Sequence, residues 1–416
     1  MQIYLVGGAV RDQLLNYPVH ERDWVVVGAT PQELIQQGYK PVGKDFPVFL
    51  HPKTKEEYAL ARTERKSGKG YTGFTFYTAP DISLEQDLAW RDLTINAIAR
   101  SADGKLVDPY GGVNDIKTKT LRHVSPAFSE DPLRVLRVAR FAARYHHLGF
   151  SVAAETRELM VSMVKAGELD FLVPERIWKE FSRALLEQSP EIFITTLRQC
   201  GALATIAPEI DLLFGVPQPP QHHPEVDTGL HCLLSLSQAA KLSSSLPVRF
   251  ATLVHDLGKA ATPQEVLPRH IGHEKRSLPL VRQICERLKI PNDCQNLALL
   301  AAQFHTHCHR ALELSPKKLL EVLGNLDAFR RPDRFFEFLL CCAADARGRT
   351  GKESSPYPQA VYLARAHDLC AAVTSKPFIE SGLSGKKLGE AIRLKRLQIL
   401  KQLNTEQLQH GKITNP

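Results

Sequence analysis

The sequence predicts an α+β fold in which a small mixed sheet forms the N-terminal part and helices form the remainder. Short apolar runs bounded by turn or charged residues predict buried strands at 3–6, 24–27, 48–50 and 58–61. From Pro132 onward the pattern is helical, and three pairs of a proline with an acidic residue have the form of helix starts: Asp131-Pro132, Pro174-Glu175 and Pro190-Glu191.

The chain has 416 residues, 43% of them hydrophobic and 24% charged, which is typical of a globular protein with several domains. The segment 215–226, GVPQPPQHHPEV, cannot sustain regular structure, and we take it as the main domain boundary. We expect four parts: a head at 1–125, a helical neck at 126–215, a second helical domain at 227–350 and a basic helical tail at 351–416. The helix predicted in the tail carries basic residues that either are solvated or contact phosphate: Lys386, Lys387, Arg393, Lys395 and Arg396.

The formal net charge of +8 suits a polyanionic partner, although many basic enzymes bind no nucleic acid. No uninterrupted apolar stretch is long enough to cross a bilayer, and no basic region precedes the N-terminal apolar run. All eight cysteines lie at or after Cys200 without a Cys-x-x-Cys pair, which is typical of reduced, buried thiols. These features predict a cytoplasmic protein with no membrane partner. The sequence does not distinguish a monomer from a homodimer.

The first candidate site combines a glycine turn with spaced carboxylates. Gly7-Gly8 follows a predicted strand and opens a helix expected at 9–15, so backbone N–H groups can face an anion there. Arg11 lies one turn into that helix, where its guanidinium could bind phosphate. Glu21 and Asp23 alternate onto one face of the next strand and could share metal ions. The alternative is a tight turn beside a solvated strand edge; the order of the residues favours metal-assisted phosphoryl transfer.

Three stretches form a longer signature that runs from residue 3 to beyond residue 140. They are Gly7-Gly8-Ala9-Val10-Arg11-Asp12 followed by Glu21-Arg22-Asp23, then Arg91-Asp92-Leu93-Thr94-Ile95-Asn96-Ala97, and then Glu130-Asp131-Pro132-Leu133-Arg134. This signature resembles bacterial CCA-adding enzymes, class II tRNA nucleotidyltransferases whose polymerase-β-like head is shared with poly(A) polymerases. The resemblance implies template-free, Mg²⁺-dependent transfer of CMP, CMP and AMP from CTP and ATP to the 3′ end of tRNA, with release of pyrophosphate. It also implies that Asp23 and Glu21 are catalytic and hold the Mg²⁺ ions.

Two positions depart from the family pattern. Glu21 stands where the family normally has aspartate, and its extra methylene allows the carboxylate to reach an ion with looser geometry. Trp90 replaces an arginine that often precedes the Arg91-Asp92 pair. We expect Asp23 to be the main ligand. Glu57 is either a third acid or an exposed edge residue.

A row of arginines recurs every three or four positions in the neck and forms one stripe of a helix: Arg134, Arg137, Arg140 and Arg144. The alternative is an exposed basic face. Asp131 lies one turn before Arg134. Cytosine and adenine both present an amine donor beside a ring-nitrogen acceptor, which a carboxylate and a guanidinium can match. Uracil and guanine reverse this pattern and would leave polar groups unmatched.

The resemblance implies that Asp131 and Arg134 select CTP and ATP in this way. It also implies that further residues bind the nucleotide, so that the predicted nucleotide-binding set is Gly8, Arg11, Arg91, Asp131, Arg134, Arg137 and Arg140.

A second candidate site begins at His255-Asp256-Leu257-Gly258-Lys259, at the end of a predicted apolar helix. Imidazoles and carboxylates together suit a divalent ion of intermediate softness, whereas an isolated His-Asp pair is usually a hydrogen-bonded core pair. With His231 upstream and Asp345 downstream, the group resembles the HD phosphohydrolase superfamily. The resemblance implies phosphatase, 2′-nucleotidase and 2′,3′-cyclic phosphodiesterase activities with Ni²⁺ or another divalent transition metal.

In this HD site the implied metal ligands are His231, His255, Asp256 and Asp345. His273 and His305 could add contacts to the substrate or to a second metal ion. The cluster of His305, His307 and His309 could instead belong to a polar loop.

Three alternatives are open at this point. A poly(A) polymerase shares the head motifs but not the HD segment. An alarmone synthetase–hydrolase also joins two such modules, with the hydrolase first. An RNA-binding protein with a degenerate head is favoured only by the departures at Glu21 and Trp90.

Overall fold

The computed structural model describes residues 1–19, 21–42, 48–66 and 74–413. The glycines among polar residues at 66–73 predict a surface loop, and apart from Lys66 this segment lies outside the described residues. The chain divides into two compact units, residues 1–206 and 207–416.

The first unit is built on a seven-stranded sheet with the strand order β3-β4-β5-β2-β1-β8-β9. Its central strands β2 and β5 run parallel, and its other neighbouring strands pair antiparallel. The strands are β1 (Gln2–Val6), β2 (Asp23–Val27), β3 (Lys40–Val42), β4 (Val48–Leu50), β5 (Glu57–Leu60), β8 (Ala99–Ser101) and β9 (Leu106–Val107). All four strands predicted from apolar runs are confirmed to within one residue at each end.

Two small sheets and, among the described residues of the head, four short α-helices accompany the main sheet. The antiparallel pair is β6 (Arg62–Lys66) with β7 (Phe74–Thr78), and the parallel pair is β10 (Thr120–Leu121) with β11 (Ser151–Val152). The helices are α1 (Gly8–Leu14), α2 (Pro31–Gln36), α3 (Leu84–Ala89) and α4 (Gly112–Lys117). The helix expected at 9–15 is therefore present as α1.

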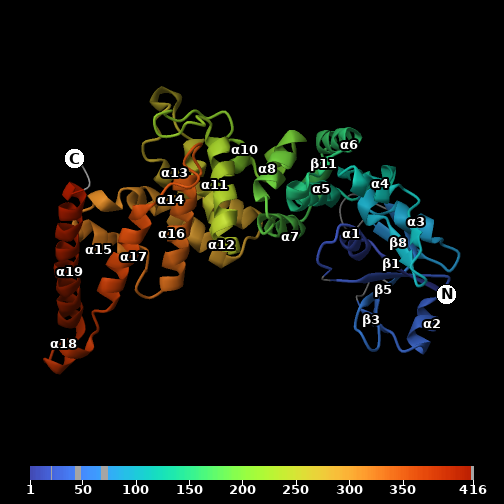
Figure 1. Ribbon diagram of the computed structural model, residues 1–416, viewed down its shortest axis with the longest axis horizontal. Helices are drawn as coiled ribbons and strands as arrows, with labels where there is room; N and C mark the ends of the chain where they lie inside the picture. Colours follow the sequence, from blue (N-terminus) through green and yellow to red (C-terminus); the bar gives the residue numbers. More distant parts are fainter. Residues whose placement is uncertain (20, 43–47, 67–73, 414–416) are drawn as a thin grey trace. The chain divides into compact units, whose positions relative to one another are not determined.

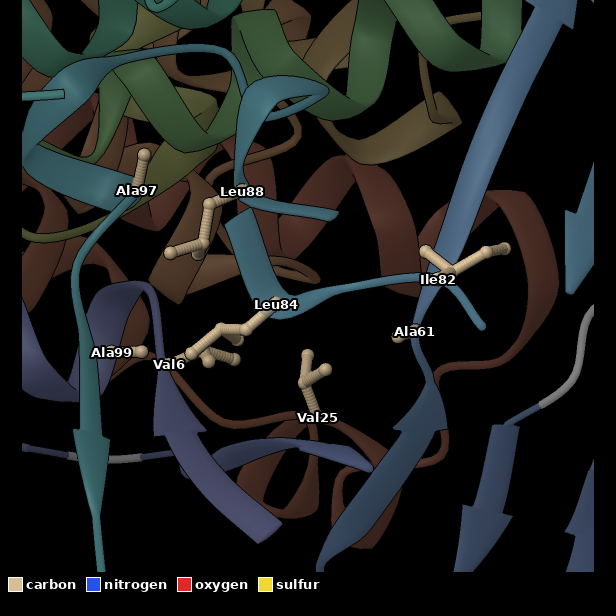
Figure 2. Close-up of a cluster of buried hydrophobic side chains, with 8 residues drawn as sticks. All are labelled: Val6, Val25, Ala61, Ile82, Leu84, Leu88, Ala97 and Ala99. Carbon is tan, nitrogen blue, oxygen red and sulfur yellow. The ribbon is translucent and has the colours of Figure 1, made fainter. Parts of the chain in front are cut away.

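The sheet is buried on both faces because alternate residues of its central strands point in opposite directions. Val6 and Val25 meet Leu84 and Leu88 of α3 on one face, as Figure 2 shows. Leu5 packs on the other face, in a separate cluster. Leu88 is fully buried, and truncation of such a leucine to alanine costs about 2–5 kcal/mol. This packing fixes the end of β1, where the glycine turn begins.

The rest of the first unit is helical, with α5 (Leu133–Tyr145), α6 (Ala154–Lys165), α7 (Pro174–Leu185), α8 (Pro190–Gln199) and α9 (Ala202–Ile206) (Figure 1). The starts predicted at Pro174 and Pro190 are confirmed. Helix α5 begins one residue later than predicted, because Pro132 is its N-cap. The two-residue strand β11 is an exception to the all-helical prediction; it pairs with a strand of the head, a long-range partnership that local periodicity does not reveal.

The second unit is helical, and the helices that the sequence predicts at 248–255, 274–288 and 333–346 are confirmed to within two residues at each end. Its α-helices are α10 (Pro208–Asp211), α11 (Thr228–Leu242), α12 (Leu246–Val254), α13 (His273–Arg287), α14 (Asn292–His309), α15 (Pro316–Asn325), α16 (Pro332–Arg347), α17 (Pro358–Ala371), α18 (Lys376–Glu380) and α19 (Gly385–Ile413). The segment 215–226 lies within this unit and has one isolated bridge, Pro217 with Asp227. His305, His307 and His309 lie on α14, so the polar-loop interpretation of this cluster is wrong.

All eight cysteines are buried and free, as predicted. Within the described part of the chain, no helix combines the length and apolarity that a membrane crossing requires.

Candidate functional site

The glycine turn places the first residues of α1 against Arg91. Gly7 has φ +68°, a left-handed conformation that favours glycine, and its N–H donates to the Ile98 carbonyl at 3.1 Å. A Cβ at Gly7 would lie 2.7 Å from Nη1 of Arg91. Glycine is therefore required at this position for its backbone conformation and for the close approach of the arginine.

Three carboxylates lie at the edge where β2 begins. Asp23 is the first residue of β2; it pairs with Val6 at the end of β1 and with Glu57 at the start of β5. Glu21, Asp23 and Glu57 are exposed, and all three line one cavity. The pKa of Asp23 is raised, first by removal of water around the carboxyl and also by the charge of Glu21, while Arg91 opposes the shift. This concentration of negative charge suits a divalent cation with oxygen ligands.

The cavity, which we call the head cavity, has a volume of about 620 Å³. That volume lies within the range of about 300–1,000 Å³ that encloses a small organic ligand. All predicted residues of the first site line it: Gly7, Gly8, Arg11, Glu21, Asp23, Glu57, Arg91, Asp131, Arg134, Arg137 and Arg140.

The arginine stripe of α5 is held in a network of buried contacts. Arg134 and Arg140 are each 6% exposed, so the interpretation as an exposed basic face is wrong. Arg134 donates to the carbonyls of Ala127 at 2.8 Å and Trp90 at 2.5 Å. Arg140 donates from Nε to Oε2 of Glu180 at 2.6 Å. The guanidinium groups are therefore held in fixed positions at the cavity wall.

Asp131 is also fixed in place. Its Oδ1 accepts from the N–H of Leu133 at 3.1 Å, and its Oδ2 accepts from Nη2 of Arg176 at 2.8 Å. Arg176 lies on α7 and lines the same cavity. Each carboxylate oxygen has two lone pairs, so Asp131 can still accept from a base amine.

Sequence reasoning assigned no role to Asp92, which lies inside the quoted motif at the cavity wall. Its carboxylate accepts from Nε of Arg137 at 2.8 Å, from Nδ2 of Asn96 at 2.8 Å and from the N–H of Leu93. Burial alone raises the pKa of Asp92, but Arg137 and Asn96 outweigh it and hold the pKa below its usual value. Asn96 also accepts from Nη1 of Arg11 at 2.5 Å, so Asp92 and Asn96 together orient two of the predicted nucleotide-binding arginines.

Arg176 and Glu180 of α7 were missed as well. Glu180 is 3% exposed and binds Arg140. No local sequence signal identifies either residue, because their partners lie forty or more positions away.

The structure brings together the four predicted HD ligands from two helices and from the residues that directly follow a third. His231 lies on α11, His255 and Asp256 directly follow α12, and Asp345 lies on α16. Nε2 of His231 is 3.0 Å from Oδ1 of Asp345, and Nε2 of His255 is 3.2 Å from Oδ2 of Asp256. All four side chains are almost fully buried.

His273 and His305 join the same cluster through the other oxygen of Asp256. Their Nε2 atoms are 3.2 Å and 3.5 Å from Oδ1 of Asp256, and 3.1 Å from each other. Asp256 therefore presents one oxygen to His255 and the other to His273 and His305. His273 and His305 therefore lie close enough to the cluster to contact a substrate or a second metal ion, as the sequence analysis expected.

The cluster fits a divalent metal ion by the chemistry of its donors. Nε2 of His255 and Oδ1 of Asp256 are buried and have no hydrogen-bond partner among the described residues. Groups of three ligand atoms within 4.8 Å of one another include His231, His255 and Asp256, and also Asp256, His273 and His305. Burial lowers the pKa of His255, but Asp256 and Asp345 outweigh it and raise the pKa to about 10. The site is thus built to hold positive charge.

Further residues that were missed contact the predicted HD ligands, among them His309 and Glu225. His309 lies 2.6 Å from Oδ2 of Asp345 through Nε2, and its Nδ1 accepts from the Tyr357 hydroxyl at 2.8 Å. Glu225 lies in the proline-rich segment, where its Oε1 is 3.1 Å from Nδ1 of His231. Its side chain is only 3% exposed. The sequence pattern indicated irregular backbone there and gave no sign that this backbone is packed against the cluster.

Three family models match separate parts of the chain. Residues 3–122 match the poly A polymerase head domain, and residues 149–213 match a probable RNA and SrmB-binding site of polymerase A. Residues 228–375 match the HD domain. The multifunctional CCA protein of Teredinibacter turnerae is 60% identical over 410 residues, which are 99% of this chain and 100% of that protein. The chain belongs to the multifunctional CCA protein family. The multifunctional CCA protein of Pseudomonas fluorescens is 60% identical, over an alignment that covers 96% of this chain and 98% of that protein.

Solved structures show the same fold at lower identity. A CCA-adding enzyme in an apo form has a TM-score of 0.65 at 18% identity and covers 99% of this chain and 92% of its own. The Bacillus stearothermophilus CCA-adding enzyme in complex with CTP has a TM-score of 0.61 at 21% identity, with coverage of 99% and 93%. The Thermotoga maritima CCA-adding enzyme complexed with tRNA has a TM-score of 0.63 at 18% identity, with coverage of 98% and 91%. The predicted fold class, a polymerase-like head followed by a helical remainder with an HD domain, is confirmed.

Proposed function

We propose that this chain adds and repairs the 3′-terminal CCA sequence of tRNA, using CTP and ATP and releasing pyrophosphate. The observation that carries the proposal is the head cavity, in which Asp23 and Glu21 face buried arginines in a chain that is 60% identical to multifunctional CCA proteins. Family membership at this identity favours CCA addition over a poly(A) polymerase.

The residues of the head cavity have complementary roles in this proposal. Asp23 and Glu21 hold Mg²⁺, which, when bound, lowers the pKa of the attacking 3′-hydroxyl and neutralises charge on the phosphates. Arg11, Arg91, Arg137 and Arg140 bind the triphosphate, and the N–H groups at Gly8 add to that binding. This arrangement positions the α-phosphate for attack by the tRNA 3′-hydroxyl.

Base selection is proposed for Asp131 and Arg134. Both line the cavity and both are held by other protein groups. A rigid acceptor and donor reject a base with the reversed pattern, because a wrong base leaves polar groups unpaired.

Measurement of Mg²⁺-dependent incorporation of labelled CMP into tRNA that lacks its end tests this proposal. Asp23→Ala should abolish incorporation and leave phosphatase activity intact. Incorporation retained by Asp23→Ala would contradict the assignment, and a wild-type chain inactive at every Mg²⁺ concentration would favour a binding module with a degenerate head.

We also propose a phosphohydrolase function for the HD cluster, with phosphatase, 2′-nucleotidase and 2′,3′-cyclic phosphodiesterase activities. His231, His255, Asp256 and Asp345 would hold Ni²⁺ or another divalent transition metal, because imidazole with carboxylate suits such ions. His255→Ala should remove these activities and leave CMP incorporation unchanged. Equal loss of both activities would argue against two separate sites.

The partner surface and the surroundings of the protein are part of the proposal. In α19, Arg393 pairs with Glu390, and Arg396 packs 3.9 Å from the ring of Phe329, so the tRNA backbone would meet the lysines there: Lys386, Lys387 and Lys395. The eight free, buried cysteines support a reducing location, the cytoplasm.

The division into head (1–125), neck (126–215), HD domain (227–350) and tail (351–416) is our proposal.

A further inference from the structure

A second cavity lies between the proline-rich segment and the loop that follows α16. Its volume is about 190 Å³. Arg347, Arg349 and Lys352 line one side, and His222 lines the other. No aspartate or glutamate from the described residues belongs to its lining. We call it the basic cavity.

Both walls of the basic cavity are attached to the HD cluster. The proline-rich wall carries Glu225, which is 3.1 Å from Nδ1 of His231. The opposite wall carries Gly348, whose carbonyl lies 3.1 Å from the same Nδ1 atom, and Arg349, whose Nη2 lies 4.0 Å from Oδ1 of Asp345. A side chain at Gly348 would overlap Ser235 of α11, so the loop is packed tightly against that helix. The basic cavity is therefore next to the metal-ligand cluster and fixed in relation to it.

The charges of the basic cavity have few protein partners. Nε of Arg349 is buried and has no hydrogen-bond partner among the described residues. The exposed side chain of Lys352 has no hydrogen bond or ion pair there either. Apart from Asp345, which lies 4.0 Å from Nη2 of Arg349, no acidic side chain pairs with these residues in the described part of the chain, and such positive side chains attract an anion. Since about 190 Å³ is below the usual range of about 300–1,000 Å³ for a small organic ligand, the cavity suits one charged group better than a whole nucleotide.

We propose that the basic cavity is a phosphate-binding subsite of the HD centre. It takes a second phosphate of a substrate whose other, terminal phosphate is hydrolysed at the His/Asp cluster. This inference rests on the proposed phosphohydrolase function. The substrate class is a ribonucleotide with two phosphate groups, either a free nucleoside bisphosphate or an RNA end that carries a terminal phosphate.

In the reaction, the oxygen of water forms a bond to the phosphorus of the terminal phosphate, and the P–O bond to the ribose breaks. The ribose oxygen leaves as a hydroxyl after it receives a proton from that water. The second phosphate remains bound and unchanged, so it contributes to binding of the substrate and should affect KM more than kcat.

The kinetic test compares adenosine 2′-monophosphate with adenosine 2′,5′-bisphosphate on the full metal-loaded chain. The wild-type KM should be about tenfold lower for the bisphosphate, the effect of one charge-assisted contact. Arg349→Gln should remove this advantage, and Lys352→Gln, which is farther from the metal ligands, should reduce it about threefold. The matched control is Arg330→Gln, because the Arg330 side chain is 80% exposed elsewhere in the same unit. An RNA trinucleotide with a terminal 2′-phosphate distinguishes the two sources: a lower KM than the bisphosphate indicates an RNA end, and a higher KM indicates a free nucleotide.

A binding measurement complements the kinetics. Adenosine 2′,5′-bisphosphate is titrated by calorimetry into the metal-free chain, with CTP present to occupy the head cavity. Binding should be about tenfold weaker to Arg349→Gln than to Arg330→Gln. The subsite proposal would be overturned if the wild-type chain had equal KM values for the monophosphate and the bisphosphate. It would also be overturned if Arg349→Gln and Lys352→Gln behaved like Arg330→Gln. If the wild type hydrolyses neither substrate but still binds the bisphosphate through Arg349, the phosphohydrolase proposal fails and the anion site stands.

Discussion

Nη2 of Arg176 donates a hydrogen bond of 2.8 Å to Oδ2 of Asp131. This contact joins α7 to the residue just before the N-cap of α5, and the N–H of Leu133 holds the other oxygen of Asp131. Two donors therefore fix the orientation of the carboxylate that is proposed to read the base.

Arg176→Gln should relax base selection, because Asp131 would lose its longer-range anchor and rotate more freely. We expect the ratio of kcat/KM for CTP over UTP to fall about tenfold. Incorporation of each nucleotide into tRNA lacking its end measures the ratio. Arg157→Gln on α6, whose side chain is exposed, is the control. An unchanged ratio in Arg176→Gln would show that Asp131 does not depend on Arg176.

Glu57→Gln tests whether the third carboxylate binds Mg²⁺. Because Glu57 pairs with Asp23 in the register of β5 and β2, a carboxylate there can share or orient an ion. We expect the Mg²⁺ concentration for half-maximal CMP incorporation to rise about fivefold, while the structure of the head stays the same. Glu56→Gln would be unsuitable as a control because Glu56 binds Trp24, so the exposed Glu85→Gln serves instead. The same Mg²⁺ dependence in Glu57→Gln and Glu85→Gln would identify Glu57 as an edge residue.

Asp92→Asn should destabilise the first unit and change how its stability depends on pH. Burial raises the pKa of Asp92, but Arg137 and Asn96 hold it below 3.8, so its stabilising effect is complete only above about pH 5. That effect is lost as the pH falls from 3.8 towards the lower folded-state pKa. At pH 7 we expect a loss of about 2 kcal/mol in the free energy of unfolding, because the buried side chain at position 92 would lose its charge-assisted hydrogen bond from Arg137.

Urea denaturation at pH 7 and between pH 4 and pH 3 measures both effects of Asp92→Asn. The variant should lose less stability than the wild type over the acid range. Asp81→Asn, at an exposed position, should behave like the wild type. If Asp92→Asn still loses stability as steeply as the wild type between pH 4 and pH 3, other titrating groups cause that loss of stability.

Glu225→Gln should weaken metal binding at the HD cluster. Glu225 and the Gly348 carbonyl both lie 3.1 Å from Nδ1 of His231 and favour a proton there, so that Nε2, which is 3.0 Å from Oδ1 of Asp345, would offer its lone pair to a metal ion. The amide oxygen of the glutamine is a weaker hydrogen-bond acceptor than the carboxylate of Glu225. We therefore expect the variant to bind Ni²⁺ about tenfold more weakly, as measured by calorimetry. The control is Glu321→Gln on α15, at an exposed ion pair. Equal Ni²⁺ affinity in the two variants would show that the Gly348 carbonyl is enough to orient His231.

Local patterns of the sequence predicted the elements that hold the head cavity and the HD cluster. Strand alternation placed Asp23 at the start of β2, and helix spacing placed the arginines of α5 on one stripe. Spacing defines a face but not what covers it. The burial of Arg140 depends on Glu180, forty residues away, and no periodicity connects the two. For the same reason Glu225 was missed, because a proline-rich composition predicts irregular backbone and says nothing about its packing.

The central claim is that the head of this chain builds CCA and stops. Its most direct test supplies CTP and ATP, singly and together, to tRNA that lacks its 3′ end, and determines the length and sequence of the product. We expect two additions with CTP alone, none with ATP alone, and three additions that end in A with both nucleotides. Continued addition of A to form a tail, or incorporation of UTP as efficient as that of CTP, would contradict the account.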